Sequence, residues 1–180
     1  MKLLLDLCGG TGAWAKPYRE NGWEVIKIDV RDGWDVRLDM EHVGRTVHGI
    51  LAAPPCTVFA NSGARWERSR DDMLAGLSVV DACLRMVAIY RPSFWALENP
   101  VGTLRKWLGK PSMIFDPCDF GDPYTKKTLL WGDFKEPEKN PVEPVKGSGT
   151  HKYGGKSRHT KIMRSRTPDG FAKAFYEANH

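Results

Sequence analysis

Three short apolar segments, each followed directly by small or polar residues, constrain the fold of this chain more than any other feature. They are residues 3–7, 48–53 and 94–97, which run into Cys8-Gly9-Gly10-Thr11-Gly12, Pro54-Pro55-Cys56 and Glu98-Asn99-Pro100. Apolar runs of this length are typical of buried strands. Open α/β sheets bind their ligands beyond the carboxyl ends of such strands. The sequence therefore predicts an α/β fold with a glycine loop, a thiol and a carboxylate at one sheet edge.

The loop after the first segment indicates a cofactor that contains adenosine. Its glycines let the backbone turn tightly and approach a ligand, and a helix expected near residues 13–14 would offer unpaired N–H groups. A second strand, residues 24–28, ends at Asp29. That carboxylate lies about 20 residues past the loop, the spacing at which an acidic residue reaches ribose hydroxyls. The loop lacks the full G-x-G-x-x-G pattern, so the prediction rests on the loop and Asp29 together.

The thiol loop is stiff, because Pro54 and Pro55 cannot donate to a sheet and each fixes its own φ. Taken alone, Pro-Pro-Cys is more typical of a structural cysteine, and Glu98 alone of an exposed carboxylate at a strand end. The convergence of Cys56, Glu98 and the glycine loop on one edge favours a reactive site over both alternatives.

Three motifs in this order resemble the cytosine-5 DNA methyltransferases: the cofactor loop Asp6-Leu7-Cys8-Gly9-Gly10-Thr11-Gly12, the nucleophile loop Pro54-Pro55-Cys56, and Glu98-Asn99-Pro100. The resemblance runs from about residue 2 to residue 132 and resumes near residue 166. It implies a Rossmann-like S-adenosylmethionine-dependent methyltransferase fold, with a mostly parallel central sheet flanked by helices. It also implies methyl transfer to C5 of cytosine in DNA. Larger family members carry a separate target-recognition domain where this chain has only about 35 residues, too few for an ordinary domain.

The resemblance implies a role for each site residue. Cys56 would supply the thiolate that adds to C6 of cytosine, and Glu98 would bind N3 and the exocyclic amine. Asn99 would fix the loop, Pro55 would face the substrate, and Asp29 would bind the ribose. The residues expected at S-adenosylmethionine are Asp6, Cys8, Gly9, Gly10, Thr11, Gly12, Asp29, Asp39 and Pro54. Asp39 would bind the adenine amine, although a capping or solvent-exposed carboxylate is nearly as typical at this position.

One family segment, Gln-x-Arg-x-Arg, grips phosphate and the active site and is replaced here. Its positions hold Tyr124, Lys126 and Thr128, and Lys127 substitutes if the strand register slips by one residue. Lysine is a point charge and cannot reproduce a bidentate guanidinium. We therefore expect Lys126 as the catalytic cation and Lys127 as a nucleic-acid contact, with less efficient capture of the base.

The net charge of +5 is concentrated near the carboxyl end. No acidic residue lies between Glu143 and Asp169, and the basic residues there are Lys146, Lys152, Lys156, Arg158, Lys161, Arg164 and Arg166. A solvated tail and an arm that contacts phosphates fit this pattern about equally. The arm interpretation makes nucleic-acid contacts of Lys156, Arg158 and Lys161. Residues 135–144, with prolines and alternating charges, are typical of a linker into the arm.

The 180 residues suit a single methyltransferase domain in which 135–166 form the linker and basic arm and 167–180 a helix that packs back. Thr167 is expected to cap that helix. Residues 113–115 and 128–131 are expected late strands. Residues 68–90 predict a long helix whose buried face would carry Leu74, Leu77, Val80, Leu84, Val87 and Ala88.

Four scattered cysteines without C-x-x-C pairs favour a reducing cytoplasmic location (bacterial, phage or nucleoid-associated) and argue against a metal site. No stretch is expected to be long and apolar enough to span a bilayer. The expected partners are nucleic acid, DNA first, and a second chain that supplies target recognition. Two alternatives stay open: methylation of a pyrimidine in RNA or a free nucleotide, and a catalytically weak DNA-binding homologue.

Overall fold

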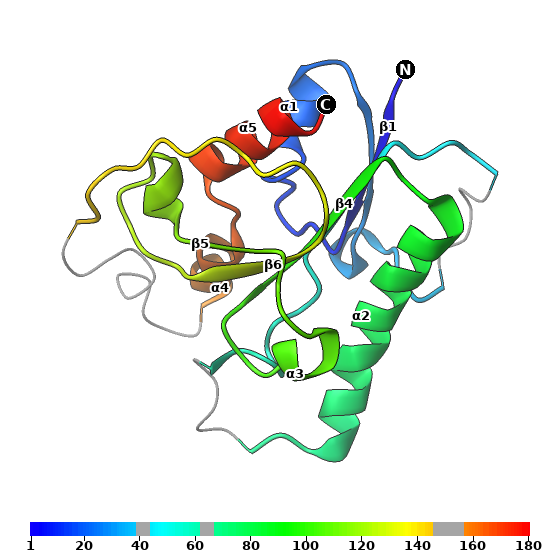
Figure 1. The fold of residues 1–180 in the computed structure, drawn as a ribbon. Helices are drawn as coiled ribbons and strands as arrows, with labels where there is room; N and C mark the ends of the chain where they lie inside the picture. The colour runs from blue at the N-terminus through cyan, green and yellow to red at the C-terminus, as the bar shows by residue number, and fades with distance from the viewer. Residues whose placement is uncertain (39–43, 62–66, 146–156) are drawn as a thin grey trace.

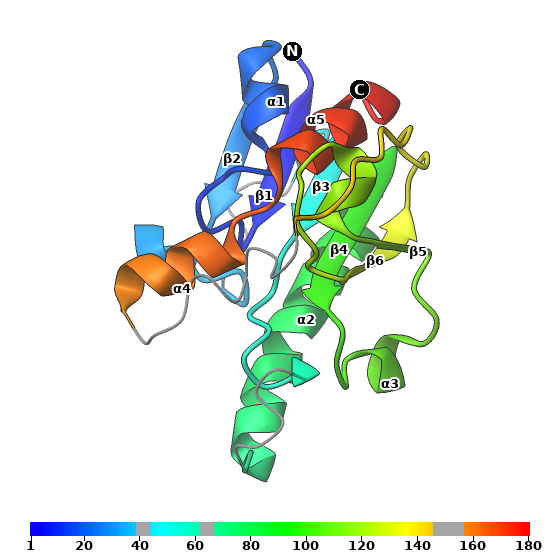
Figure 2. The ribbon, with the colours of Figure 1, turned by 90° about the vertical axis from the view of Figure 1, so that its left-hand side faces the viewer.

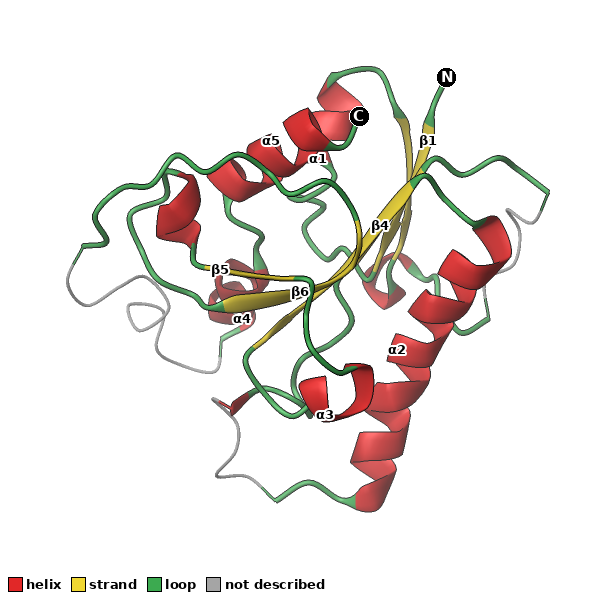
Figure 3. Cartoon of the chain, viewed as in Figure 1, coloured by secondary structure: helices red, strands yellow, loops and turns green. Residues whose placement is uncertain are grey.

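The computed structural model describes residues 1–38, 44–61, 67–145 and 157–180. A six-stranded sheet with the order β2-β1-β3-β4-β6-β5 forms its centre (Figures 1 and 3). The strands are β1 Leu3–Leu7, β2 Glu24–Ile28, β3 Gly49–Ala52, β4 Phe94–Pro100, β5 Met113–Phe115 and β6 Thr128–Asp133. Strands β2, β1, β3 and β4 are parallel, whereas β6 runs antiparallel to both β4 and β5. The sheet is therefore a parallel half extended by two antiparallel strands.

Helices cover both faces of this sheet. Helix α2, Arg70–Tyr90, lies on one face, and α1, Lys16–Glu20, and α5, Asp169–Ala178, lie on the other (Figure 1). The alternation of side chains along β1 explains the two layers. Leu3, Leu5 and Leu7 pack in the core beneath α2, whereas Leu4 packs with aromatic residues of α1 and α5. Shorter elements are η1 Val30–Asp32, α3 Arg105–Leu108, η3 Pro117–Phe120 and α4 Arg158–Ser165.

Helix α2 begins with a capping box, because Ser69 Oγ accepts from the Asp72 N–H at 3.0 Å and the Asp72 carboxylate accepts from the Ser69 N–H at 3.1 Å. The predicted buried face is wrong at both ends. Leu74 is 54% exposed and Ala88 is also exposed, while Met86 is fully buried. The amino-terminal half of α2 extends beyond the sheet, so Leu74 has no strand to pack against (Figure 1).

Helix α2 also overturns the expectation about membrane-spanning stretches. Its 21 residues and a mean hydropathy of 1.6 make it, by length and composition only, long and apolar enough to cross a membrane. Core helices of globular domains meet the same test. Val80, Ala82, Cys83 and Met86 are buried in the fold, so the carboxyl-terminal half of α2 packs on the sheet.

Helix α5 holds the carboxyl end of the chain against α1. Trp14 lies between Phe171 and Phe175, with ring centroids 5.7 and 5.3 Å away. The Tyr18 hydroxyl donates to the carbonyl oxygen of Asn179 at 3.0 Å. The predicted threonine cap is wrong: Pro168 is the N-cap residue, and no side chain caps the helix.

The predicted linker at residues 135–144 is attached to η3 through its second half. The backbone N–H groups of Asn140 and Val142 donate to the carbonyl oxygens of Asp119 and Cys118, both at 2.9 Å. These two hydrogen bonds hold the segment on the domain, so it is not a free linker. The physical reason is that the η3 carbonyls need partners that the short helix does not provide.

Within the predicted basic arm, residues 158–165 form α4, which sequence reasoning did not anticipate. Ser157 caps this helix by accepting from the Thr160 N–H at 3.1 Å. Lys156 and Asp39 lie outside the described residues. Arg158 falls on the first turn of α4 and Lys161 on the next, where the backbone alone is described.

Candidate active site at the sheet edge

The carboxyl ends of β2, β1, β3 and β4 lie in a row at one edge of the sheet (Figure 2). Leu7 pairs with Ile28 and with Ala52, and Ala52 pairs with Leu97. Because these last pairs lie at one level, the glycine loop, the thiol loop and Glu98 follow at the same edge. This is the arrangement that the strand pattern predicts.

The glycine loop crosses directly over Asp6. A Cβ at Gly9 would lie 2.1 Å from Asp6 Oδ1, so any larger residue there would displace the carboxyl group. Gly10 has a φ of +56°, in the left-handed region that favours glycine. The Gly10 N–H donates to Asp29 Oδ2 at 2.8 Å, and Lys27 Nζ donates to the Gly10 carbonyl oxygen at 3.2 Å. These two bonds hold the loop on the end of β2.

Asp6 is a buried carboxyl group with an unused oxygen. It is 1% exposed, and Oδ2 has no hydrogen-bond partner within the described part of the chain. Burial raises its pKa to about 7, against the opposing effect of Lys27 and Arg19. Buried polar atoms are normally paired. The unpaired oxygen beneath a tight loop therefore marks a cradle that a polar or cationic ligand can complete.

Asp29 and Cys8 are engaged within the fold. Asp29 is 4% exposed, and its Oδ1 accepts from the Arg31 N–H at 2.9 Å while Oδ2 accepts from Gly10. The Cys8 N–H donates to the carbonyl oxygen of Ile28 at 2.8 Å, and the Cys8 thiol, together with burial, raises the pKa of Cys83 on α2. Both residues thus join the glycine loop to its neighbours. Two further loop positions, Thr11 and Gly12, lie on the same turn.

The thiol loop is fixed from β4. Asn99 is buried, and its Nδ2 donates to the Pro54 carbonyl oxygen at 3.0 Å. The Cys56 carbonyl oxygen accepts from the N–H groups of Phe59 and Ala60 at 3.0 and 2.8 Å, which closes a turn behind the thiol. Cys56 itself is partly exposed. The loop therefore presents a positioned thiol at the surface of the site.

Opposing charges meet at Cys56. Burial and the nearby Glu98 carboxylate raise the pKa of the Cys56 thiol, whereas Lys126 and Arg164 act to lower it. Burial also raises the pKa of Glu98, and Lys126 opposes that rise. A thiol, a carboxyl group and two cations from four different segments therefore act on one another at this edge.

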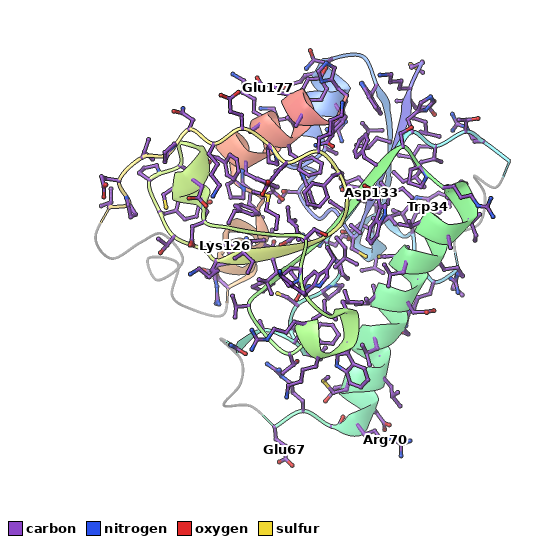
Figure 4. All side chains as sticks on the ribbon, viewed as in Figure 1. Trp34, Glu67, Arg70, Lys126, Asp133 and Glu177 are labelled. Atoms are coloured by element: carbon purple, nitrogen blue, oxygen red, sulfur yellow. The ribbon has the colours of Figure 1, made fainter. Side chains whose placement is uncertain are left out.

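Glu98 lines a small pocket together with Lys126, the residue of this pocket that Figure 4 labels. Its lining residues are Glu98, Phe115, Lys126, Thr128, Thr167, Pro168 and Phe171. The Lys126 N–H donates to Asp116 Oδ1 at 2.9 Å, which fixes the backbone of this residue. Lys127 lies on the outside, 4.0 Å from the same carboxylate. The pocket is therefore lined by Lys126 and not by Lys127.

Sequence reasoning missed several residues at this site. Arg68 donates to the carbonyl oxygens of Val58 and Ala60 at 2.5 and 2.8 Å and so supports the thiol loop. Thr167 and Pro168 line the pocket, and Arg164 acts on the thiol. The concentration of positive charge in residues 146–166 is the only sequence signal for Arg164. Nothing in the sequence pattern indicates that Arg68 turns back onto this loop.

The comparisons with known proteins identify a shared fold. No protein-family model matches the chain, and no curated protein matches it. Among the solved structures that match is an E. coli protein provisionally described as a DNA modification methyltransferase encoded within a prophage. The match has a TM-score of 0.59 and 15% sequence identity, and it covers 81% of this chain and 53% of the other. This chain therefore spans about half the length of that structure and has the fold of the matched half.

Proposed function

We propose that this protein is a Rossmann-like methyltransferase that moves a methyl group from S-adenosylmethionine to C5 of cytosine in DNA, through a covalent bond to Cys56. The observation that carries the proposal is the meeting of Cys56, Glu98 and Lys126 at the sheet edge, beside the glycine loop over Asp6. The fold shared with the prophage protein and the resemblance in three motifs support it.

S-adenosylmethionine suits the cradle at the glycine loop. The cofactor supplies a methyl group on a positively charged sulfur. The glycine loop lies directly over Asp6, and the free Asp6 oxygen can accept a hydrogen bond from a cationic ligand. Asp29 already accepts from Gly10, but a carboxylate oxygen has room for a second donor. Asp29 can therefore take a ribose hydroxyl without releasing the loop.

The residues at the pocket fit the chemistry that C5 methylation requires. Cytosine C5 is a weak nucleophile, and addition of the Cys56 thiolate to C6 makes it electron-rich. After methylation, loss of the C5 proton and departure of the thiolate restore the ring. Glu98, with its raised pKa, can hold a proton and share it with N3 as charge builds. Lys126 favours the thiolate against the effect of burial.

A trapping experiment tests the proposal. Duplex DNA of mixed sequence that carries 5-fluorocytosine is incubated with protein and cofactor, because fluorine at C5 prevents the loss that releases the enzyme. We expect a covalent adduct that peptide mapping places on Cys56. The adduct should vanish in Cys56→Ala and persist in Cys118→Ala, a matched change at another partly exposed cysteine. An adduct that survives in Cys56→Ala refutes the assignment of the nucleophile.

The same assay separates the substrate classes. Single-stranded DNA, RNA and the free nucleotide dCMP, each with 5-fluorocytosine, are compared with the duplex. Trapping on dCMP alone would exclude DNA as the substrate. Absence of an adduct on every substrate, together with retained binding to duplex DNA, would identify a DNA-binding homologue without this activity.

A further inference from the structure

Helix α4 ends at the mouth of the pocket. Lys126 Nζ donates to the carbonyl oxygen of Arg166, directly after α4, at 3.4 Å. The next two residues, Thr167 and Pro168, line the pocket together with Glu98. Figure 2 shows α4 below the end of the sheet to which β1 and β2 point. The segment that directly follows α4 therefore forms part of the wall of the candidate active site.

The position of the segment that follows α4 is fixed by contacts of residues 166–171 with other parts of the fold. The Arg166 guanidinium donates to both carboxylate oxygens of Asp169, each at 2.8 Å. The Gly170 N–H donates to Asp122 Oδ2 at 2.9 Å, which ties the start of α5 to the segment before Lys126. Phe171 stacks on Phe115 with ring centroids 4.0 Å apart. The end of α4 is thus held from both sides.

Arg164, in the last turn of α4, is exposed and makes no ion pair with any residue that the structure describes. By contrast, Arg166 pairs with Asp169, and Lys127 pairs with Asp116. The charge of Arg164 nevertheless reaches the Cys56 thiol. An unpaired guanidinium at a pocket that also holds a lysine presents a planar set of donors, which suits the oxygens of a phosphate group.

Building on the proposed function, we propose that Arg164 and Lys126 form a phosphate-binding site that takes the phosphodiester next to the target pyrimidine. Lys126 offers a point charge only, and Arg164 adds the fork-shaped donor set that the segment from Tyr124 to Thr128 lacks. The phosphate would bridge α4 and the segment before β6. Binding of the nucleic-acid backbone would then position the base against Cys56 and Glu98.

Neutral linkages test the phosphate site. Each 5-fluorocytosine in the duplex is flanked by methylphosphonates, and affinity is compared with the ordinary duplex. Wild type should lose about tenfold, the value of one charge-assisted hydrogen bond. Arg164→Gln should bind the ordinary duplex more weakly than wild type does, and it should lose less affinity on the neutral duplex, because only Lys126 then contacts the phosphate. Arg164→Lys should fall between them, and Arg105→Gln, an exposed arginine on α3, should behave as wild type.

A second measurement needs neither cofactor nor DNA. The pH dependence of Cys56 alkylation reports the charges that face the thiol: Glu98 of β4, Lys126 before β6, and Arg164 of α4. Arg164→Gln should move the midpoint of alkylation to higher pH, and Arg105→Gln should not. An unchanged midpoint in Arg164→Gln would refute the placement of this arginine beside the thiol.

The outcomes separate this inference from the proposed function. Wild-type protein that forms the Cys56 adduct but binds ordinary and neutral duplexes equally would overturn the phosphate site and leave the covalent chemistry in place. Arg164→Gln that remains as sensitive to the neutral linkages as wild type would overturn it as well. Failure of the adduct on every substrate would refute the proposed function, and the phosphate site with it, whatever the alkylation midpoint shows.

Discussion

The buried carboxyl group of Asp6 should make the stability of this protein depend on pH. Burial raises its pKa from the ordinary value of 3.8 to about 7. At low pH the carboxyl group is protonated in both the folded and the unfolded chain. As the pH rises, the unfolded chain ionises first and is stabilised, so the folded state loses stability until the pH passes about 7. Asp6 therefore favours folding at low pH and opposes it at neutral pH.

The magnitude follows from the separation of the two pKa values. About three pH units at 1.36 kcal/mol each correspond to about 4 kcal/mol over the whole range. Between pH 5 and pH 8 the share of that loss is about 2.5 kcal/mol. Domains of this size unfold with about 5–15 kcal/mol, so the change is a large fraction of the total. A single substitution should remove it.

Asp6→Asn keeps the shape of the side chain and cannot ionise. Urea unfolding followed by tryptophan fluorescence gives the free energy of unfolding of both proteins at pH 5, 6.5 and 8. Relative to wild type, the variant should gain about 2.5 kcal/mol between pH 5 and pH 8. Asp133→Asn, at an exposed carboxylate, is the control and should follow wild type. If the free energies of unfolding of wild type and Asp6→Asn change with pH in the same way, Lys27 and Arg19 keep the Asp6 carboxylate ionised. That result would refute a raised pKa for Asp6.

Three further predictions concern the site. Glu98→Gln should lower turnover about 10²-fold in a methylation assay, because it cannot share a proton; the melting temperature should hold, and full turnover would return Glu98 to an ordinary strand-end carboxylate. Asn99→Ala should lower the free energy of unfolding in urea by about 1–3 kcal/mol, because it leaves the buried Pro54 carbonyl without its donor; an unchanged value would mean that water replaces the amide. Neutralising Lys156, Arg158 and Lys161 together should flatten the log–log slope of duplex affinity against salt concentration, which is about −0.9 per phosphate contact. An unaltered slope would indicate that this segment is solvated and does not contact phosphates.

The strands and their shared edge could be predicted because their signals are local. β1 is a run of buried residues that ends in glycines, and β4 ends in Glu98, Asn99 and a proline. Strand bounds follow from such punctuation, and parallel pairing then brings the carboxyl ends together. The expected bounds of β1, β2 and β5 agree with the structure to the residue. No long-range information is needed for that part of the site.

The buried face of α2 shows where local patterns fail. Leu74 belongs to the apolar stripe of the helix, yet it is exposed, because the amino-terminal half of α2 extends beyond the sheet. A hydrophobic pattern indicates which residues could be buried, whereas the extent of the neighbouring sheet decides which of them are. The same limit applies to residues 135–144, whose composition is that of a linker but in which two backbone N–H groups pair with η3.

The contribution of α4 could not be read from the sequence for a related reason. Arg164 reaches the thiol only because the chain between Thr167 and Phe171 is pinned beside Lys126 by contacts from distant segments. A short polar helix has little tendency to form or to dock by itself. Its position is decided by the buried aromatic side chains of α5, which follow it in the chain. The guanidinium that we propose for the phosphate site therefore lies in an element whose positive charge is its only sequence signal.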